Sequence, residues 1–432
     1  MNSRIVPLLA ALLFLPHLAP AAIRAEERNH LADAEAALRA NDNDAALRAL
    51  DALIKEKPEH PGGRFWRGRL LAMTGEFAKA LVDLNESLRL QPQNPPALAH
   101  RGYVHQKQRR FDEALADFNQ ALRLDPRELL AVYCRGLVLA ERGDTLAALG
   151  DLDATLEINP NHIDALHTRG QLHLIRREWD KALVDFDRCI AMNERDAIGY
   201  SGRGGVHFMR GKFKEAIADY TKAMELLPRD PRPLVQRGYA HAGAGETEKA
   251  FADFDAALKI DAKEPGALLG RAELRRTTKQ WEPALKDYEA VLAIAPEEFR
   301  ALLGRASTLY GSGDVAKALT AYGEIIQKIP DEAQPYNDYA WLLATGPDES
   351  LRNGARAVEL AMKACTLSDW QNAAYVDTLA AAQAERGEFA DAVRWQQYAV
   401  QLSESEPPEV RADIESRVAL YRDKKPYREV LK

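Results

Sequence analysis

One dipeptide recurs at a constant distance along most of the chain. Arginine followed by glycine or alanine returns every 34 residues, at Arg67-Gly68, Arg101-Gly102, Arg135-Gly136, Arg169-Gly170, Arg203-Gly204, Arg237-Gly238, Arg271-Ala272 and Arg305-Ala306. A second series keeps the same period, at Ala80, Ala114, Ala148, Ala182, Ala216, Ala250, Ala284 and Ala318. Such a sequence specifies similar small units, each of which buries its apolar surface mainly against its neighbours. The chain is therefore predicted to fold as a linear array of repeats.

The unit from residue 95 to 126 shows what each repeat contains. Its apolar residues follow the period of an α-helix twice. They are Leu98, Tyr103 and Val104 in the first stretch, and Ala114, Leu115, Phe118, Ala121 and Leu122 in the second. Pro126 ends the second helix because proline disfavours helical geometry in the residue before it. In other units a glycine marks the turn between the helices, as in residues 142–144. Each unit is therefore predicted to be a pair of helices, and the fold class is all-α.

Five positions of this unit resemble a known repeat. Phe111, Ala114, Phe118, Ala121 and Pro126 stand where the tetratricopeptide repeat places aromatic, small, aromatic, small and proline residues. The resemblance to the tetratricopeptide repeat family implies a right-handed superhelical solenoid of about twelve antiparallel helix pairs. Residues 61–332 are expected to form eight regular units. Residues 26–60 are expected to form a degenerate N-terminal repeat whose polar outer surface caps the array.

The period changes after residue 332. A first helix is still predicted over residues 333–345, but residues 346–354 lengthen the turn that follows it. Further helices are predicted up to residue 402, and a charged closing helix over residues 409–421, so residues 333–432 form a C-terminal part of repeat-like pairs. Its segments WLLAT, DTLAAA and LYRDKKPYRE resemble a C-terminal module of bacterial tetratricopeptide proteins whose role is unassigned. This resemblance implies no activity.

Residues 1–25 have the features of a secretory signal. Arg4 is followed by an apolar run from Ile5 to Leu18 and by a stretch of small residues, and we expect cleavage before Glu26. The alternative is a short membrane anchor, which is disfavoured because a run of about 14 apolar residues is shorter than the about 20 that a bilayer requires. The protein is thus expected to be exported to the periplasm or secreted, with no membrane span after cleavage.

The charge of the mature chain argues against a nucleic-acid partner. The signal contains two of the 58 basic residues and none of the 65 acidic residues, which leaves a net charge of −9. Nucleic-acid-binding proteins usually present a surplus of lysine and arginine to the phosphates.

A pattern of opposite charges accompanies the repeat. Arginine at unit position 7 and aspartate at position 23 keep one spacing through seven units. Buried charges require partners. We therefore predict ion pairs within or between adjacent repeats for Arg67/Asp83, Arg101/Asp117, Arg135/Asp151, Arg169/Asp185, Arg203/Asp219, Arg237/Asp253 and Arg271/Asp287.

The resemblance also implies where a ligand would bind. In tetratricopeptide proteins the first helices line the concave face, through unit positions 2, 5, 9, 12 and 13. Carried onto this chain, these positions give the candidate ligand-binding residues Phe65, Tyr103, Tyr133, His167, Phe208, Tyr239 and Tyr310. Because tyrosine and arginine dominate binding hot spots, the expected partner is a peptide or a protein segment of unknown identity. The alternative is that these rings pack between neighbouring first helices.

Neither a metal site nor a cofactor is predicted. Histidine recurs at unit position 11, in His105, His173, His207 and His241. Helices of adjacent repeats lie about 8 to 10 Å apart, whereas zinc requires its nitrogen ligands within about 2.1 Å. The three cysteines, Cys134, Cys189 and Cys365, are widely spaced and are interpreted as small core residues.

The sequence favours an exported scaffold that binds a peptide or protein in the groove of the array, and not an enzyme. Residues 205–212 imitate a phosphate-binding loop, but they have one residue too many between the glycines and lie on a predicted helix. Two alternatives stay open. One is a structural array in an envelope complex that acts through its convex surface or its ends. The other is a processing factor or enzyme with a scattered site. The sequence does not indicate an oligomeric state.

Overall fold

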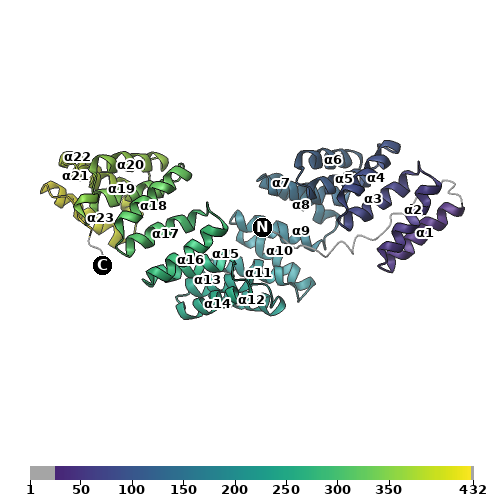
Figure 1. Cartoon of the computed structure of the whole chain (residues 1–432), viewed down its shortest axis with the longest axis horizontal. Helices are drawn as coiled ribbons and strands as arrows, with labels where there is room; N and C mark the ends of the chain where they lie inside the picture. The colour runs from purple at the N-terminus through teal and green to yellow at the C-terminus, as the bar shows by residue number, and fades with distance from the viewer. Residues whose placement is uncertain (1–24, 430–432) are drawn as a thin grey trace. The chain divides into compact units, whose positions relative to one another are not determined.

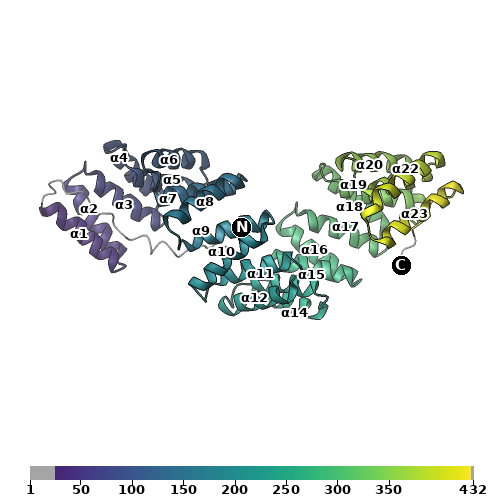
Figure 2. The same cartoon turned by 180° about the vertical axis from the view of Figure 1, so that it is seen from behind.

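The computed structural model describes residues 25–429, and every regular element in this range is helical (Figures 1 and 2). The signal expected over residues 1–25 lies outside the described residues, apart from Ala25, where helix α1 begins. Within the described range, no helix combines the length and the apolar character needed to cross a bilayer. The predicted all-α fold of successive helix pairs is confirmed.

The chain divides into two compact units, residues 1–206 and 207–432. In the described part of the first unit, each repeat consists of a first helix followed by a second helix. The pairs are α1 (Ala25–Arg39) with α2 (Asn43–Glu56), α3 (Pro61–Met73) with α4 (Phe77–Leu90), α5 (Pro95–Lys107) with α6 (Phe111–Leu124), α7 (Leu129–Glu141) with α8 (Thr145–Ile158), and α9 (Ile163–Ile175) with α10 (Trp179–Met192). The boundary between the units falls within α11 (Ala197–Met209).

The second compact unit continues the same order of helices. It contains α12 (Phe213–Leu226), α13 (Arg232–Gly243) with α14 (Thr247–Ile260), α15 (Pro265–Thr277) with α16 (Trp281–Ile294), α17 (Phe299–Gly311) with α18 (Val315–Lys328), α19 (Ala333–Thr345) with α20 (Gly354–Leu367), α21 (Ala373–Glu385) with α22 (Phe389–Leu402), and α23 (Pro408–Arg422). The lengthened turn expected between α19 and α20 is present and contains a short 3-10 helix, Glu349–Leu351.

The number of helix pairs agrees with the prediction of about twelve. The described residues hold eleven pairs, α1 to α22, followed by α23 as a single helix. Residues 425–429 follow α23 without regular secondary structure.

In most pairs the turn between the helices contains a residue with a left-handed backbone, which glycine provides in only some of the repeats. Gly143 follows α7 with φ of 84°, and Arg109 takes the equivalent place after α5 with φ of 60°. Glycine adopts this conformation freely, whereas another residue loses roughly 1 kcal/mol or more. Because the repeat tolerates that loss of free energy, the glycines in the sequence identify only some of these turns.

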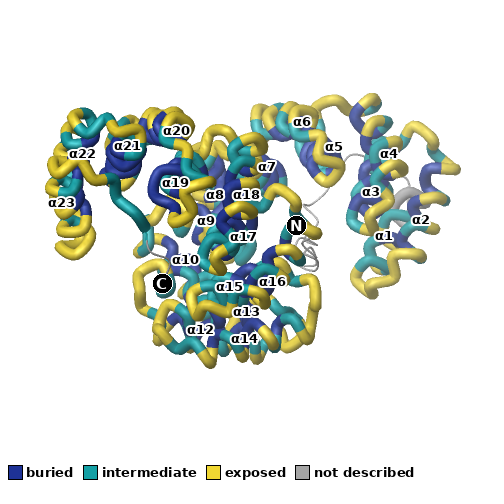
Figure 3. The backbone as a smooth tube through the Cα atoms, turned by 60° about the vertical axis from the view of Figure 1, so that its left-hand side comes forward, coloured by how far each residue is buried: buried dark blue, intermediate teal, exposed yellow. Residues whose placement is uncertain are grey.

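The core lies between the two helices of each pair. Phe118 is fully buried, and a Cβ atom on Gly102 would lie 2.6 Å from its ring, so the close approach of α5 and α6 requires glycine there. Towards the C-terminus, α21 contacts α19, α20 and α22, and buried residues follow one another along it (Figure 3). The apolar positions of the repeat are therefore the core positions that the helical period predicted.

Arginine and aspartate side chains connect the helices of a pair, as predicted. In six units the arginine at position 7 donates two hydrogen bonds to the aspartate at position 23, over 2.6 to 2.9 Å. These pairs are Arg67/Asp83, Arg101/Asp117, Arg135/Asp151, Arg169/Asp185, Arg237/Asp253 and Arg271/Asp287. In each pair the aspartate is buried. The predicted ion pairs are confirmed in these units.

The same arginines also reach the preceding repeat. Arg169 donates from Nη1 to Asp153 Oδ1 over 2.7 Å, and Arg101 donates from Nη1 to Asn85 Oδ1 over 2.9 Å. Arg203 has the corresponding contact with Asp187, at 2.8 Å. The spacing in the sequence left open whether the contacts lie within or between repeats. The guanidinium groups make both kinds of contact, so they connect successive helix pairs as well as the two helices of one pair.

Candidate functional site: the inner face of the first helices

We define the inner face as unit positions 2, 5, 9, 12 and 13 of the first helices. First helices of neighbouring repeats contact one another: α3 with α5, α5 with α7 and α7 with α9 in the first compact unit, and α13 with α15, α15 with α17 and α19 with α21 in the second. Throughout the described residues, no contact of similar extent joins successive second helices. The first helices are thus crowded together on one side of each stack, where concave binding surfaces form in repeat proteins.

One of the seven candidate residues is buried. Phe65 is 8% exposed, and its ring centroid lies 5.0 Å from that of Trp66 and 5.7 Å from that of His100 on the next first helix. Phe65 therefore packs between repeats. The other six candidates are partly exposed: Tyr103, Tyr133, His167, Phe208, Tyr239 and Tyr310.

Two of the partly exposed tyrosines also contact the next repeat. The ring of Tyr133 lies 4.4 Å from the ring of His162, at the start of α9. The Tyr239 hydroxyl donates to the carbonyl oxygen of Gly266, at the start of α15, over 3.2 Å. Burial raises the pKa of both tyrosines, so their hydroxyl groups stay protonated. Both rings fit the alternative of packing between repeats, and both side chains stay partly exposed.

Tyr103 and Phe208 make different contacts. The ammonium group of Lys107 lies 5.1 Å from the Tyr103 ring centroid, one helical turn away on α5. Phe208 meets Phe213 edge-on, with the ring centroids 5.7 Å apart. Tyr103 thus offers a ring flanked by a cation, an arrangement that suits a partner with aromatic and acidic groups. Ligand binding by these residues remains a prediction.

The inner face of α19 is contacted by residues 427–429 of the same chain. The ring of Tyr427 lies 5.6 Å from that of Trp341, and Trp341 Nε1 donates to the Glu429 carboxylate over 2.5 Å. The backbone amide of Glu429 donates to the carbonyl oxygen of Thr345 over 2.9 Å. Trp341 and Thr345 stand at positions 9 and 13 of their repeat. A short irregular segment of this chain thus contacts an inner-face surface through its rings, its charge and its backbone.

Tyr310 lies beside this terminal segment. Burial raises the pKa of its hydroxyl, and the neighbouring Glu429 raises it further. Tyr310 belongs to α17 and is thus a candidate residue close to a segment that contacts the inner face. The repeat period does not predict this contact, because Trp341 and Glu429 are 88 residues apart and no repeat spacing relates them.

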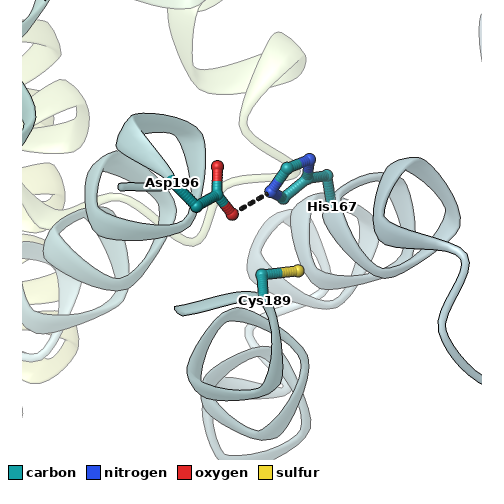
Figure 4. A group of neighbouring side chains, drawn as sticks. All are labelled: His167, Cys189 and Asp196. Atoms are coloured by element: carbon teal, nitrogen blue, oxygen red, sulfur yellow. Dashed lines mark hydrogen bonds and ion pairs between the residues drawn. The ribbon is translucent and has the colours of Figure 1, made fainter. Parts of the chain in front are cut away.

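A second group of side chains meets in the first compact unit. His167 on α9, Cys189 on α10 and Asp196 just before α11 lie together (Figure 4). His167 Nε2 lies 2.6 Å from Asp196 Oδ2. From the sequence, His167 was predicted as a ligand-binding residue and Cys189 as a core residue, with no contact between them.

The four histidines at unit position 11 lie in separate repeats. His105 and His241 each have Nε2 within 3.9 Å of an aspartate of the arginine–aspartate series. In His173 and His241, the Nδ1 atom lies within 2.7 Å of a glutamate in the turn that follows the helix. These side chains support the charged contacts of their own repeat and do not gather at one point.

Asp338 on α19 should make the stability of the second compact unit depend on pH. Burial raises the pKa of its carboxyl to about 6, although hydrogen bonds from Asn337 and Gln334 oppose the rise. Between pH 4 and 6 the folded chain then binds more protons than the unfolded chain, so stability falls as the pH rises through this range. We expect Asp338→Asn to raise the unfolding free energy by about 1 to 3 kcal/mol at pH 7, and by little below pH 4.

Urea denaturation between pH 4 and 8 measures this effect. Asp331→Asn is the control, because Asp331 is exposed just before the same helix. Equal pH profiles for the two variants would show that Asp338 does not titrate as its burial implies.

Family models assign the chain to a known family. Two models of the tetratricopeptide repeat match it, one over residues 102–172 and the other over residues 31–95, 167–231 and 269–337. These ranges cover more than half of the chain, which therefore belongs to the tetratricopeptide repeat family. Comparison with curated protein sequences gives no match.

Several solved structures are similar to parts or most of this chain. A tetratricopeptide repeat protein from Parabacteroides merdae is 25% identical, with 55% of this chain and 93% of that chain covered and a TM-score of 0.43. Yeast Tom70 is 15% identical, with 93% and 97% covered and a TM-score of 0.48. YrrB, described as a tetratricopeptide protein with an unusual peptide-binding site, is 23% identical, with 42% and 94% covered and a TM-score of 0.37. The family and its fold support the role of a protein-interaction scaffold in general.

Proposed function

We propose that this protein is an exported scaffold that binds an extended segment of a partner protein on its inner face. The observation that carries the proposal is the position of residues 427–429 on α19. Their contacts with Trp341 and Thr345 are of the kinds that a bound peptide makes, namely ring against ring, carboxylate with indole N–H, and backbone with backbone. The terminal segment thus supports the inner face as a surface for extended peptides.

The described part of the first compact unit offers comparable groups on its inner face. Tyr103 and Tyr133 lie on successive first helices of its inner face, with Lys107 beside Tyr103. Tyrosine is enriched at binding hot spots because it combines a large apolar ring with a polar hydroxyl. A partner segment with an aromatic side chain near a carboxylate, as in Tyr427 and Glu429, fits this surface.

Export is the second part of the proposal. It is supported by the apolar run from Ile5 to Leu18 and by the small residues that follow it. The mature chain then begins near Glu26 and meets its partner outside the cytoplasm. N-terminal sequencing of the protein from an envelope fraction tests this part.

The binding face is tested with two variants of the first compact unit. Tyr103→Ala removes an inner-face ring, and Val184→Ala removes an apolar side chain that is 65% exposed on the second helix α10. Proteins that co-purify from the envelope fraction are identified, and their affinity for each variant is measured. Tyr103→Ala should weaken binding by about 2 kcal/mol, roughly thirtyfold, with Val184→Ala unchanged.

The opposite result favours the structural-array alternative. If Val184→Ala releases the partners and Tyr103→Ala retains them at unchanged affinity, the outer helices carry the interaction. Circular dichroism of both variants controls for loss of folding.

A further inference from the structure

Three ligand-type side chains converge from three successive segments of the first compact unit. One ligand atom each of His167, Cys189 and Asp196 lies within 4.8 Å of the other two (Figure 4). Cys189 is fully buried, and the side chains of His167 and Asp196 are only 12% and 8% exposed. The site therefore holds a nitrogen, a sulfur and an oxygen donor in a largely water-excluded place.

The other repeats serve as an internal comparison. The three residues stand at unit positions 5, 27 and 34, and positions 5 and 34 also meet in the preceding repeat, as Tyr133 and His162. The contact itself is thus a general feature of the array. Among the eight regular units, however, each of the other seven has at most one histidine, cysteine, aspartate or glutamate at these three positions. The combination is specific to the repeat that begins at residue 163.

The Asp196 carboxylate is oriented towards the group. Its Oδ1 accepts a hydrogen bond from the backbone amide of Ile198 over 3.2 Å, while Oδ2 faces His167. A Cβ atom on residue 199 would lie 2.7 Å from Oδ2, so Gly199 leaves room for that oxygen. Backbone contacts that hold a carboxylate in place are typical of the surroundings of metal ligands.

We propose that His167, Cys189 and Asp196 bind one divalent transition-metal ion of the zinc type. Imidazole, thiolate and carboxylate are the ligands that such ions take, at about 2.0 to 2.3 Å, with water in the fourth position of an open tetrahedral site. These bond lengths place the ligand atoms about 3.3 to 3.8 Å apart, so shifts of roughly 1 Å bring the group into position. The inference does not depend on the proposed peptide binding.

Binding changes the protonation of two ligands. The S–H bond of Cys189 breaks, its electron pair forms the sulfur–metal bond, and the proton passes to solvent. His167 binds through Nε2 as the neutral imidazole, so the hydrogen bond between Nε2 and Asp196 Oδ2 breaks and its proton passes through solvent to Nδ1. The ion then connects α9, α10 and the residue before α11, which should raise the thermal stability of this repeat as the ion concentration rises above its dissociation constant.

Cobalt titration of the chelator-treated full chain tests the proposal, because a cobalt–thiolate bond produces a charge-transfer band in the near ultraviolet. Three variants each introduce the residue found at the same position of another repeat. They are Cys189→Ala, as at Ala121, His167→Ser, as at Ser201, and Asp196→Asn, as at Asn94. Cys134→Ala is the control for a buried thiol outside the group.

The wild-type chain and Cys134→Ala should show the thiolate band, saturating at one Co²⁺ per chain and reversed by Zn²⁺. Cys189→Ala should lose the band, and His167→Ser and Asp196→Asn should bind at least about tenfold more weakly. The proposal is overturned if millimolar Co²⁺ gives no band in the wild type, or if the band survives Cys189→Ala. It is also overturned if His167→Ser and Asp196→Asn both bind as the wild type does.

Discussion

Replacing Arg417 by methionine should destabilise the second compact unit by about 3 to 5 kcal/mol. Arg417 on α23 is 4% exposed and donates two hydrogen bonds to Asp377 on α21, over 2.8 and 2.9 Å. Its guanidinium also lies 5.5 Å from the Trp341 ring centroid and 5.0 Å from that of Tyr427. Without Arg417 the Asp377 carboxylate is left buried with no opposite charge, which is the main source of the loss.

The pH dependence of this variant identifies the cause. Burial raises the pKa of the Asp377 carboxyl, and Arg417 opposes that rise. In Arg417→Met the pKa should rise further above its value in the unfolded chain, so the variant recovers stability as the pH falls and Asp377 takes up a proton. Guanidinium denaturation at pH 5 and 8 measures the difference.

A double variant provides the control. Asp377→Leu with Arg417→Met removes both charges, and Gln396 keeps its hydrogen bond to the carbonyl oxygen of Ile414 at 2.8 Å. Most of the lost stability should return, because a buried ion pair can often be replaced by apolar side chains. A double variant as unstable as Arg417→Met would mean that packing of the arginine, and not the unpaired carboxylate, dominates.

The second large effect is expected from Arg169. This residue links the nearly buried Asp185 of its own repeat with Asp153 of the repeat before it. Arg169→Met leaves Asp185 without its arginine, and a loss of about 3 kcal/mol or more is expected. Hydrogen exchange should show the opening in α9 and α10 first, because each repeat of an array is supported mainly by its neighbours.

The equivalent change at Arg271 is a matched comparison. Asp287 keeps a second cation after Arg271→Met, since Arg275 Nη1 lies 2.6 Å from its Oδ2. Arg271→Met should therefore cost at least about 1 kcal/mol less than Arg169→Met. Equal losses at the two sites would contradict the view that an uncompensated buried carboxylate sets the magnitude.

The repeat period explains why much of this fold could be predicted. A residue that keeps its place through many units must serve the same contact in each, and so the spacing of Arg101 and Asp117 predicted an ion pair that the structure contains. The period also predicted the helix pairs and the core alanines. The period could not predict which inner-face rings are accessible to a partner. Phe65 and Tyr103 both stand at inner-face positions, but only Phe65 is buried.

Contacts that break the period were missed. The terminal segment meets α19 through Glu429 and Trp341, which no repeat spacing relates. The group of His167, Cys189 and Asp196 is different, since its three positions are defined within one repeat. An alignment of the eight regular units would have revealed it, because only the unit that begins at residue 163 has a ligand-type residue at all three positions.

The most direct test of the central claim is whether the inner face of α19 binds a separate peptide. The chain is shortened after Asp423, which retains all of α23, and a labelled peptide with the sequence of residues 424–432 is titrated into it by fluorescence anisotropy. The shortened chain should bind the peptide, Trp341→Ala should weaken binding by at least about 2 kcal/mol, and the full chain should bind it far less because its own segment competes. No binding to a folded shortened chain, or equal binding with Trp341→Ala, would contradict the account.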